Sequence, residues 1–151
     1  MLVLWLAIAG VAVLLDQLVK HWIVANLVVG QTQALMPKLM DLLYVRNYGA
    51  AWSILQGKTW FFYIVTTIAT IVILYLLIRK KEVHPLFKIS LSLLLGGALG
   101  NLIDRIHLGY VVDMFQLKFI NFPIFNVADT FVTIGVILLF IDLIFLDKES
   151  I

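Results

Sequence analysis

The feature that most constrains this chain is a run of 20 residues, 59–78, that contains no charged side chain. About 20 apolar residues allow a helix to cross the hydrocarbon core of a bilayer. Lipid leaves backbone polar groups without partners unless the segment satisfies them itself, so this run is expected to be helical. Three further segments, at about 1–24, 86–104 and 124–146, are of similar length and mostly apolar, although each contains charged residues. The sequence therefore predicts an all-α membrane protein with four transmembrane helices.

Composition agrees with this class and excludes several others. Hydrophobic residues make up 63% of the chain and charged residues 13%, whereas a soluble domain carries roughly a quarter charged residues. A net charge of +2, without a basic arm, gives no reason to expect nucleic-acid binding. The absence of cysteine excludes disulfides and thiolate chemistry. No repeat or linker divides the chain, so residues 1–151 are expected to form a single domain.

The first apolar segment has an alternative interpretation as a cleavable signal peptide. No Lys or Arg precedes it, and Asp16 and Lys20 follow its apolar part in place of a small-residue cleavage site. We therefore expect a retained helix. The connecting segment 25–58 is of mixed polarity, and its stretch "DLLYVRNYGAAW" combines short β-prone runs with a glycine. This pattern predicts a small sheet or hairpin.

Polar residues gather at one membrane face of the predicted bundle. The ends of spans one and three lie on the same face as the starts of spans two and four. That face receives Asp16, Lys20, Asn101, Asp104, Arg105, Asp113, Asn126 and Asp129. The short loop between spans two and three is basic, which is typical of the cytoplasmic side. Lys and Arg also occur in the longer loops opposite. We expect both termini in the cytoplasm and the polar cluster outside.

Paired carboxylates in a partly dry site separate in proton affinity, leaving one acid and one base. Such a pair can hydrolyse a peptide bond without a metal or a covalent intermediate. Asp104, Asp113 and Asp129 are the candidates. Other hydrolytic schemes fit poorly, because the chain has no HExxH or GxSxG motif and its histidines are scattered. There is no phosphate-binding loop or dinucleotide fingerprint, so neither a metal nor a cofactor is expected.

Each of these residues also has a structural interpretation. Asn126 could cap the fourth helix, with Asp129 favouring its positive end. Asp16 and Lys20 are four residues apart and could form an ion pair. Asp104 and Arg105 could be interfacial anchors. The glycines of "GGALG" could serve close helix packing.

Five motifs then occur in order along the chain: "DQLVK", "RNYGAAW", "GGALGNLIDR", "VVDMF" and "FNVAD". Together they closely resemble lipoprotein signal peptidase, also called signal peptidase II, over essentially the whole chain. In that family the VVD and FNxAD motifs carry the catalytic aspartates, which correspond here to Asp113 and Asp129. The family's other functional positions fall on Asp16, Lys20, Asn47, Gly49, Ala50, Asn101, Asp104, Arg105, Asn126 and Ala128.

The resemblance implies an aspartic endopeptidase of the bacterial cytoplasmic membrane that needs no cofactor. Its substrates would be prolipoproteins carrying a diacylglyceryl cysteine, cut just before that cysteine. It implies that segment 25–58 forms an extracytoplasmic sheet and that the active site faces the same side.

The residues alone do not decide which two aspartates are catalytic, or which of them is the acid and which the base. Spacing alone allows Asp104 as a catalytic partner, whereas the resemblance gives it a supporting role. Asn101 and Asp104 share a helical face, from which they could hold the loop that carries Asp113. The helix dipole favours ionised Asp129 as the base, with Asp113 as the protonated acid.

Two other classes of protein are compatible with four membrane spans and acidic residues at one membrane face. One is a small proton-coupled membrane carrier. Such a carrier is expected to have polar residues that continue toward the other face, and the uncharged run 59–78 argues against this. The other is a non-catalytic assembly factor or scaffold, which would not need paired carboxylates.

Overall fold

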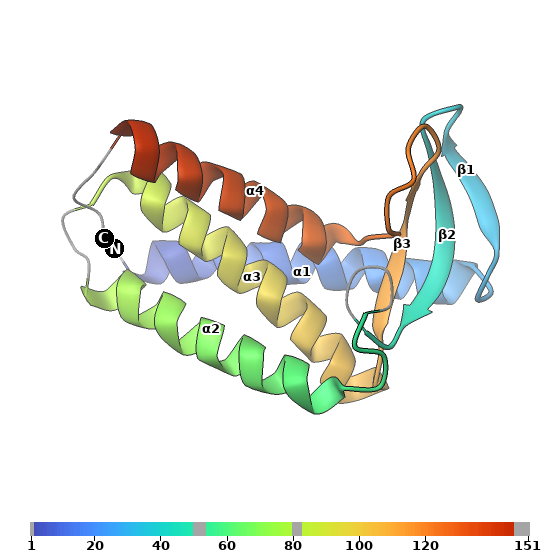
Figure 1. The fold of residues 1–151 in the computed structure, drawn as a ribbon, viewed down its shortest axis with the longest axis horizontal. Helices are drawn as coiled ribbons and strands as arrows, with labels where there is room; N and C mark the ends of the chain where they lie inside the picture. The colour runs from blue at the N-terminus through green and yellow to red at the C-terminus, as the bar shows by residue number, and fades with distance from the viewer. Residues whose placement is uncertain (1, 50–53, 80–82, 147–151) are drawn as a thin grey trace.

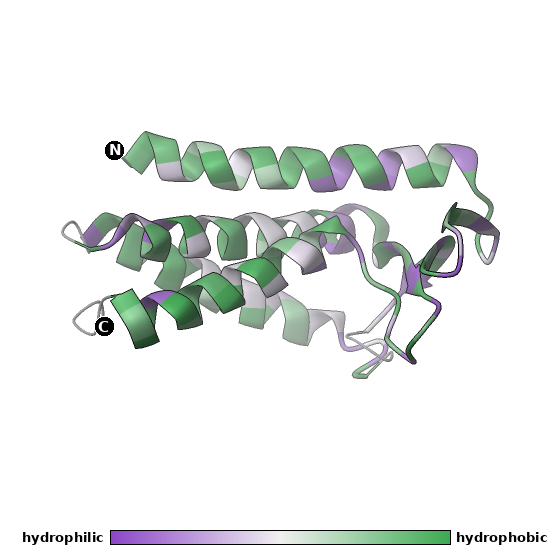
Figure 2. Cartoon of the chain, turned by 90° about the horizontal axis from the view of Figure 1, so that it is seen from above, coloured by the Kyte–Doolittle hydropathy of each residue, from purple (hydrophilic) through white to green (hydrophobic). Residues whose placement is uncertain are grey.

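The computed structural model describes residues 2–49, 54–79 and 83–146. Helices α1 (Leu2–Asn26), α2 (Thr59–Arg79), α3 (Pro85–Leu108) and α4 (Val127–Ile141) form a bundle with a small sheet at one end (Figure 1). All are long and apolar enough to cross a membrane, α4 together with the π-helical turn Asp142–Leu146. Hydrophobic residues cover most of each helix (Figure 2). The predicted class, four membrane helices with a small sheet, is confirmed.

The last two spans differ from their expected bounds for local reasons. α3 continues past residue 104 to Leu108 and ends at Gly109, whose φ of 79° is left-handed and whose N–H donates to the Arg105 carbonyl. α4 begins at Val127 rather than at 124, because Asn126 caps it. The preceding residue, Phe125, instead exchanges backbone hydrogen bonds with Phe115.

The sheet consists of β1 (Thr32–Met36), β2 (Met40–Asn47) and β3 (Val111–Leu117), antiparallel in the order β1-β2-β3. The first two strands come from the segment predicted to form a hairpin. The third comes from the connection between α3 and α4, where the sequence analysis expected a loop. The loop that was to carry Asp113 is thus a strand, because its backbone completes the edge of β2 and pairs Asp113 with Val45.

Two apolar clusters hold the ends of the molecule together. One joins the first half of α1 to α2 and α3, through residues that include Trp5, Ile73 and Leu91. The other docks the end of α1 against the sheet, with Ile23 packed among residues of β2 and β3 such as Tyr44. The sheet is therefore fixed to the bundle chiefly through α1.

Helix α3 is the centre of the bundle and packs against the other three helices. A Cβ added to Gly96 would lie 2.6 Å from the Cβ of Ala12 in α1, and one added to Gly97 would lie 2.5 Å from the Ala128 carbonyl oxygen in α4. Glycine therefore permits close approach on both sides. The packing interpretation of these glycines agrees with the structure.

We predict that Gly97→Ala lowers the free energy of unfolding by about 1–3 kcal/mol, because the added methyl group would push against the α4 backbone. Thermal unfolding in detergent would measure the change. Gly10→Ala is the matched control, since a Cβ there meets nothing within 4 Å. Equal midpoints for the two variants would contradict the proposed role of Gly97.

Candidate active site

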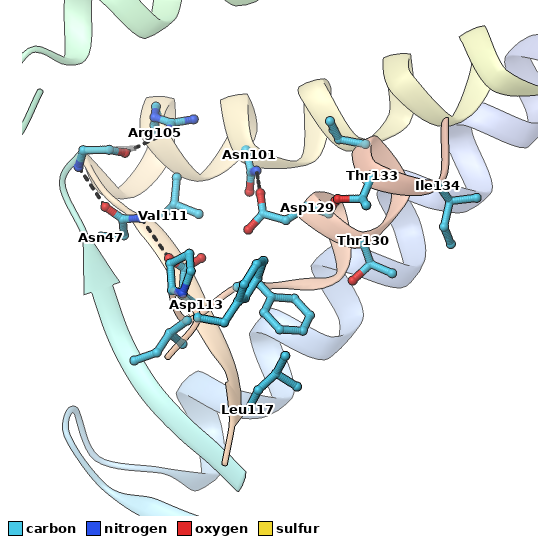
Figure 3. Close-up of a pocket in the computed structure, with 16 residues that line it drawn as sticks. Asn47, Asn101, Arg105, Val111, Asp113, Leu117, Asp129, Thr130, Thr133 and Ile134 are labelled. Atoms are coloured by element: carbon cyan, nitrogen blue, oxygen red, sulfur yellow. Dashed lines mark hydrogen bonds between the residues drawn. The ribbon is translucent and has the colours of Figure 1, made fainter. Parts of the chain in front are cut away.

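Asp113 and Asp129 line the same cavity, of about 520 Å³, where the sheet meets α3 and α4 (Figure 3). Asp113 lies on β3 and is 2% exposed, while Asp129 lies in the first turn of α4. Backbone hydrogen bonds from Met114 and Phe115 to the Phe125 carbonyl join β3 to the segment that enters α4. This pairing brings the two carboxylates, which are 16 positions apart in the sequence, to one site.

Asparagine side chains orient both carboxylates. Asn47 donates from Nδ2 to Asp113 Oδ2 over 2.9 Å, and Asn126 donates from Nδ2 to Asp113 Oδ1 over 2.7 Å. Asn101 on α3 donates to Asp129 Oδ1 over 2.8 Å (Figure 3). Strand β2, helix α3 and the entry to α4 therefore fix the carboxylate planes, and the site is organised before any substrate binds.

Asn126 and Asp129 also form a reciprocal cap at the start of α4. The Asp129 N–H donates to Asn126 Oδ1 over 2.9 Å, and the Asn126 N–H donates to Asp129 Oδ2 over 3.1 Å. The capping interpretation of Asp129 is therefore compatible with a functional one. One carboxylate oxygen closes the cap while the other accepts from Asn101.

Burial raises the pKa of Asp113 from 3.8 to about 7, and the nearby charge of Asp129 adds to the increase. Hydrogen bonds from Asn47 and Asn126 and the charge of Lys20 lower the pKa of Asp113 and offset part of this effect. Since a carboxyl with a pKa near 7 holds its proton for a large part of the time at neutral pH, Asp113 can act as an acid there.

A buried ion network lies behind the cavity and connects four elements. Lys20 Nζ is 2.9 Å from Asp16 Oδ2 and 2.9 Å from Asp104 Oδ2, and it donates to Asn101 Oδ1 over 2.9 Å. Asp16, Lys20 and Asp104 are each at most 3% exposed. Asp16 accepts from the Ala128 N–H at the start of α4, over 2.8 Å.

Asp104 reaches the strand that carries Asp113 but does not line the cavity. Its Oδ2 accepts from the Val112 N–H over 2.9 Å. The cavity wall includes Asn101 and Arg105 but not Asp104. The geometry thus gives Asp104 the supporting position that was expected for it, and it is no exposed interfacial anchor.

Gln17 belongs to this network and was missed by the sequence analysis. Its Nε2 donates to Asp104 Oδ1 over 2.9 Å and to the Gly100 carbonyl over 3.1 Å. The available signal was its position in "DQLVK", three residues before Lys20 and therefore on a neighbouring part of the same helix face.

Arg105 fixes the turn that follows β2. Its Nη2 donates to the Gly49 carbonyl over 3.2 Å, while the Gly49 N–H donates to Asn47 Oδ1 over 2.9 Å. The guanidinium also lies over the ring of Phe62, 4.4 Å from its centroid. Ala50, another expected site position, lies outside the described residues.

The fold and site define a multi-pass membrane protein with a pre-oriented carboxylate pair at one end of its helices, of which Asp113 is buried and Asp129 is half-buried. Within residues 2–49, 54–79 and 83–146, no three His, Cys, Asp or Glu side chains converge as a metal site would require. Asp113 and Asp129 are the acidic side chains that line the shared cavity.

The family model described as "Signal peptidase (SPase) II" matches residues 8–145. The lipoprotein signal peptidase of Latilactobacillus sakei is 56% identical over 95% of this chain and 95% of its own length. That of Enterococcus faecalis is 48% identical over 99% and 93%. A bacterial membrane enzyme solved by the in meso method at 2.3 Å superposes with a TM-score of 0.88 at 40% identity, covering 92% of this chain and 86% of its own. The chain belongs to the signal peptidase II family and is a membrane protease.

We predict that Lys20→Met destabilises the fold by about 3–5 kcal/mol, because it leaves buried Asp16 and Asp104 without their cation. Thermal unfolding in detergent would report the loss. Lys118→Met is the matched control, since Lys118 pairs with the largely buried Asp41 while 41% of the Lys118 side chain is exposed. Such a pair contributes about 1 kcal/mol or less. A Lys20 variant as stable as the Lys118 variant would show that the buried network is dispensable.

Proposed function

We propose that this protein is an aspartic endopeptidase that removes the signal peptide from diacylglyceryl-modified prolipoproteins, cutting before the lipidated cysteine. The observation that carries the proposal is the shared cavity of Asp113 and Asp129 with its asparagine supports. The names and similarity of the lipoprotein signal peptidases described above support the substrate class.

In the proposed reaction, Asp129 is the base and Asp113 the acid. Asp129 takes a proton from a water molecule as that water attacks the scissile carbonyl carbon, and Asp113 donates its proton to the carbonyl oxygen. The tetrahedral intermediate then collapses: Asp113 takes back the proton from its hydroxyl group as the C=O bond re-forms, the C–N bond breaks, and Asp129 gives its proton to the leaving nitrogen. Asp129 lies in the first turn of α4 and lines the same cavity as Asp113. The raised pKa of Asp113 supports its role as the acid.

The rest of the cavity suits a lipid-modified peptide. Its wall continues from the carboxylates over apolar side chains of the segment that enters α4 and of α4 itself, among them Phe122, Ile124 and Val132. Apolar walls favour acyl chains and a hydrophobic signal segment, while the pre-oriented carboxylates act on the peptide bond. We propose that this face lies outside the cytoplasm, because Arg79 lies at the opposite end of α2 and the sequence that follows it is basic.

The test is cleavage of a diacylglyceryl-modified prolipoprotein by purified protein in the presence of chelator, followed by gel shift. We expect the wild type to cleave, and Asp113→Asn and Asp129→Asn each to lose at least about 100-fold in rate, as expected when an acid or base is removed. Asp104→Asn is expected to retain part of the activity. Near-wild-type cleavage by either folded dyad variant would remove that residue from the mechanism, and no cleavage by folded wild type would contradict the proposal.

The pKa of Asp113 predicts a pH dependence. If the protonated form of Asp113 is active, kcat/KM falls as pH rises through about 7, where that proton is lost. The hydrogen bond from Asn47 lowers the pKa of Asp113, so Asn47→Ala should move the midpoint of this decline to higher pH. Pre-steady-state cleavage over pH 5–9 would measure it. A kcat/KM that instead rises as pH increases through about 7 would contradict the assignment of Asp113 as the acid.

A further inference from the structure

A second cavity, of about 580 Å³, lies between the ends of α1 and α3. Val111 and Asp113 line the active-site cavity, whereas Tyr110 and Val112 line this one. Because alternate residues of a strand point to opposite faces, β3 separates the two cavities. The second cavity will be called the back cavity.

The back cavity lies at the depth where the helices leave the apolar part of the bilayer. Its wall is formed by the last three turns of α1, which ends at Asn26, and the last two turns of α3, which ends at Leu108. Trp22 and Ile106, nearby on the same turns, are 49% and 61% exposed. Tryptophan is typical of the membrane interface. Lipid headgroups and the upper parts of acyl chains occupy this level.

The buried polar side chains at the inner end of the back cavity, called its floor, already have hydrogen-bond or ion-pair partners. Gln17 donates to Asp104, and Lys20 lies between Asp104 and Asp16. Since this triad holds two carboxylates and one lysine, the floor brings no net positive charge. A ligand must therefore be recognised at the rim.

The rim offers groups that bind phosphate. His21 Nδ1 is 2.7 Å from the Gln17 carbonyl and donates to it, so Nε2 can donate to a phosphate oxygen in the imidazolium form of the ring. His107 comes from α3 on the other side of the cavity. The Arg46 guanidinium lies 4.9 Å from the centroid of the Tyr110 ring, which lines the cavity. It makes no ion pair with a carboxylate within the described residues.

These groups suit a phosphodiester better than a metal ion. Among the described residues, His21, His107 and Asp104 do not converge closely enough to hold a metal. A fixed guanidinium with two imidazoles spread around an opening can instead reach different oxygens of one phosphate. The exposed apolar residues beside the opening would contact acyl chains.

We propose that the back cavity binds an anionic phospholipid, with its phosphate at the rim formed by Arg46, His21 and His107. The site does not depend on the proposed peptidase mechanism. Its occupant would lie against Asp104 and Val112, whose mutual hydrogen bond holds β3, and would thereby support the strand that carries Asp113.

Native mass spectrometry of the delipidated full-length protein, titrated with phosphatidylglycerol, tests the proposal. We expect one saturable phosphatidylglycerol site in the wild type, and affinity at least about tenfold lower in Arg46→Gln and in the double variant His21→Ala/His107→Ala. Ala25→Trp should abolish the site by filling the cavity while leaving the rim charges in place. Lys38→Gln, which removes an equal charge in the turn between β1 and β2, should bind like the wild type.

Three results would overturn the proposal: saturable binding that survives both Arg46→Gln and Ala25→Trp, equal affinity for phosphatidylcholine, or displacement of phosphatidylglycerol by millimolar inorganic phosphate. The last would indicate a site for free phosphate. Circular dichroism of each variant shows that it is folded, and the readout does not involve cleavage. The lipid site can therefore fail while the proposed peptidase function stands, and the reverse also holds.

Discussion

The rest of the structure depends on the buried ion network of Asp16, Lys20 and Asp104. Ion pairs inside a membrane protein carry a large desolvation cost, and a triad is retained only where its geometry satisfies nearly every donor and acceptor. Here each member has a second task. Asp16 holds the first turn of α4 through the Ala128 N–H, Asp104 holds β3 through the Val112 N–H, and Lys20 holds Asn101. The network thus determines where the two halves of the active site lie.

Two asparagine side chains link the ion network to the carboxylates of Asp113 and Asp129 through hydrogen bonds. Asn101 accepts from Lys20 and donates to Asp129, and its Oδ1 also accepts from Asn126, which donates in turn to Asp113. Neutral amides suit this task because they fix the direction of the carboxylates without adding charge, as the proposed acid–base pair requires. A change at Lys20 should therefore affect both fold stability and the orientation of the dyad.

Sequence reasoning was most successful where one local property decided the outcome. Apolar length located the helices, and the spacing of Asn126 and Asp129 indicated a helix cap that the structure contains. It was wrong about β3, because "VVDMFQL" places Asp113 at a buried position and so conceals its strand pattern. It also missed Gln17, whose partners lie more than 80 residues away along the chain.

The sequence by itself determined the membrane class and the end of the helices at which the polar residues gather. These follow from hydrophobic length and from helix direction, which are properties of each segment alone. Only the tertiary structure decided which carboxylates meet. Asp104 and Asp113 are both near the end of α3, yet Asp104 is held by Lys20 behind β3 while the pleat of that strand turns Asp113 toward Asp129. That choice depends on pairing between β2, β3 and the entry to α4, which no local pattern encodes.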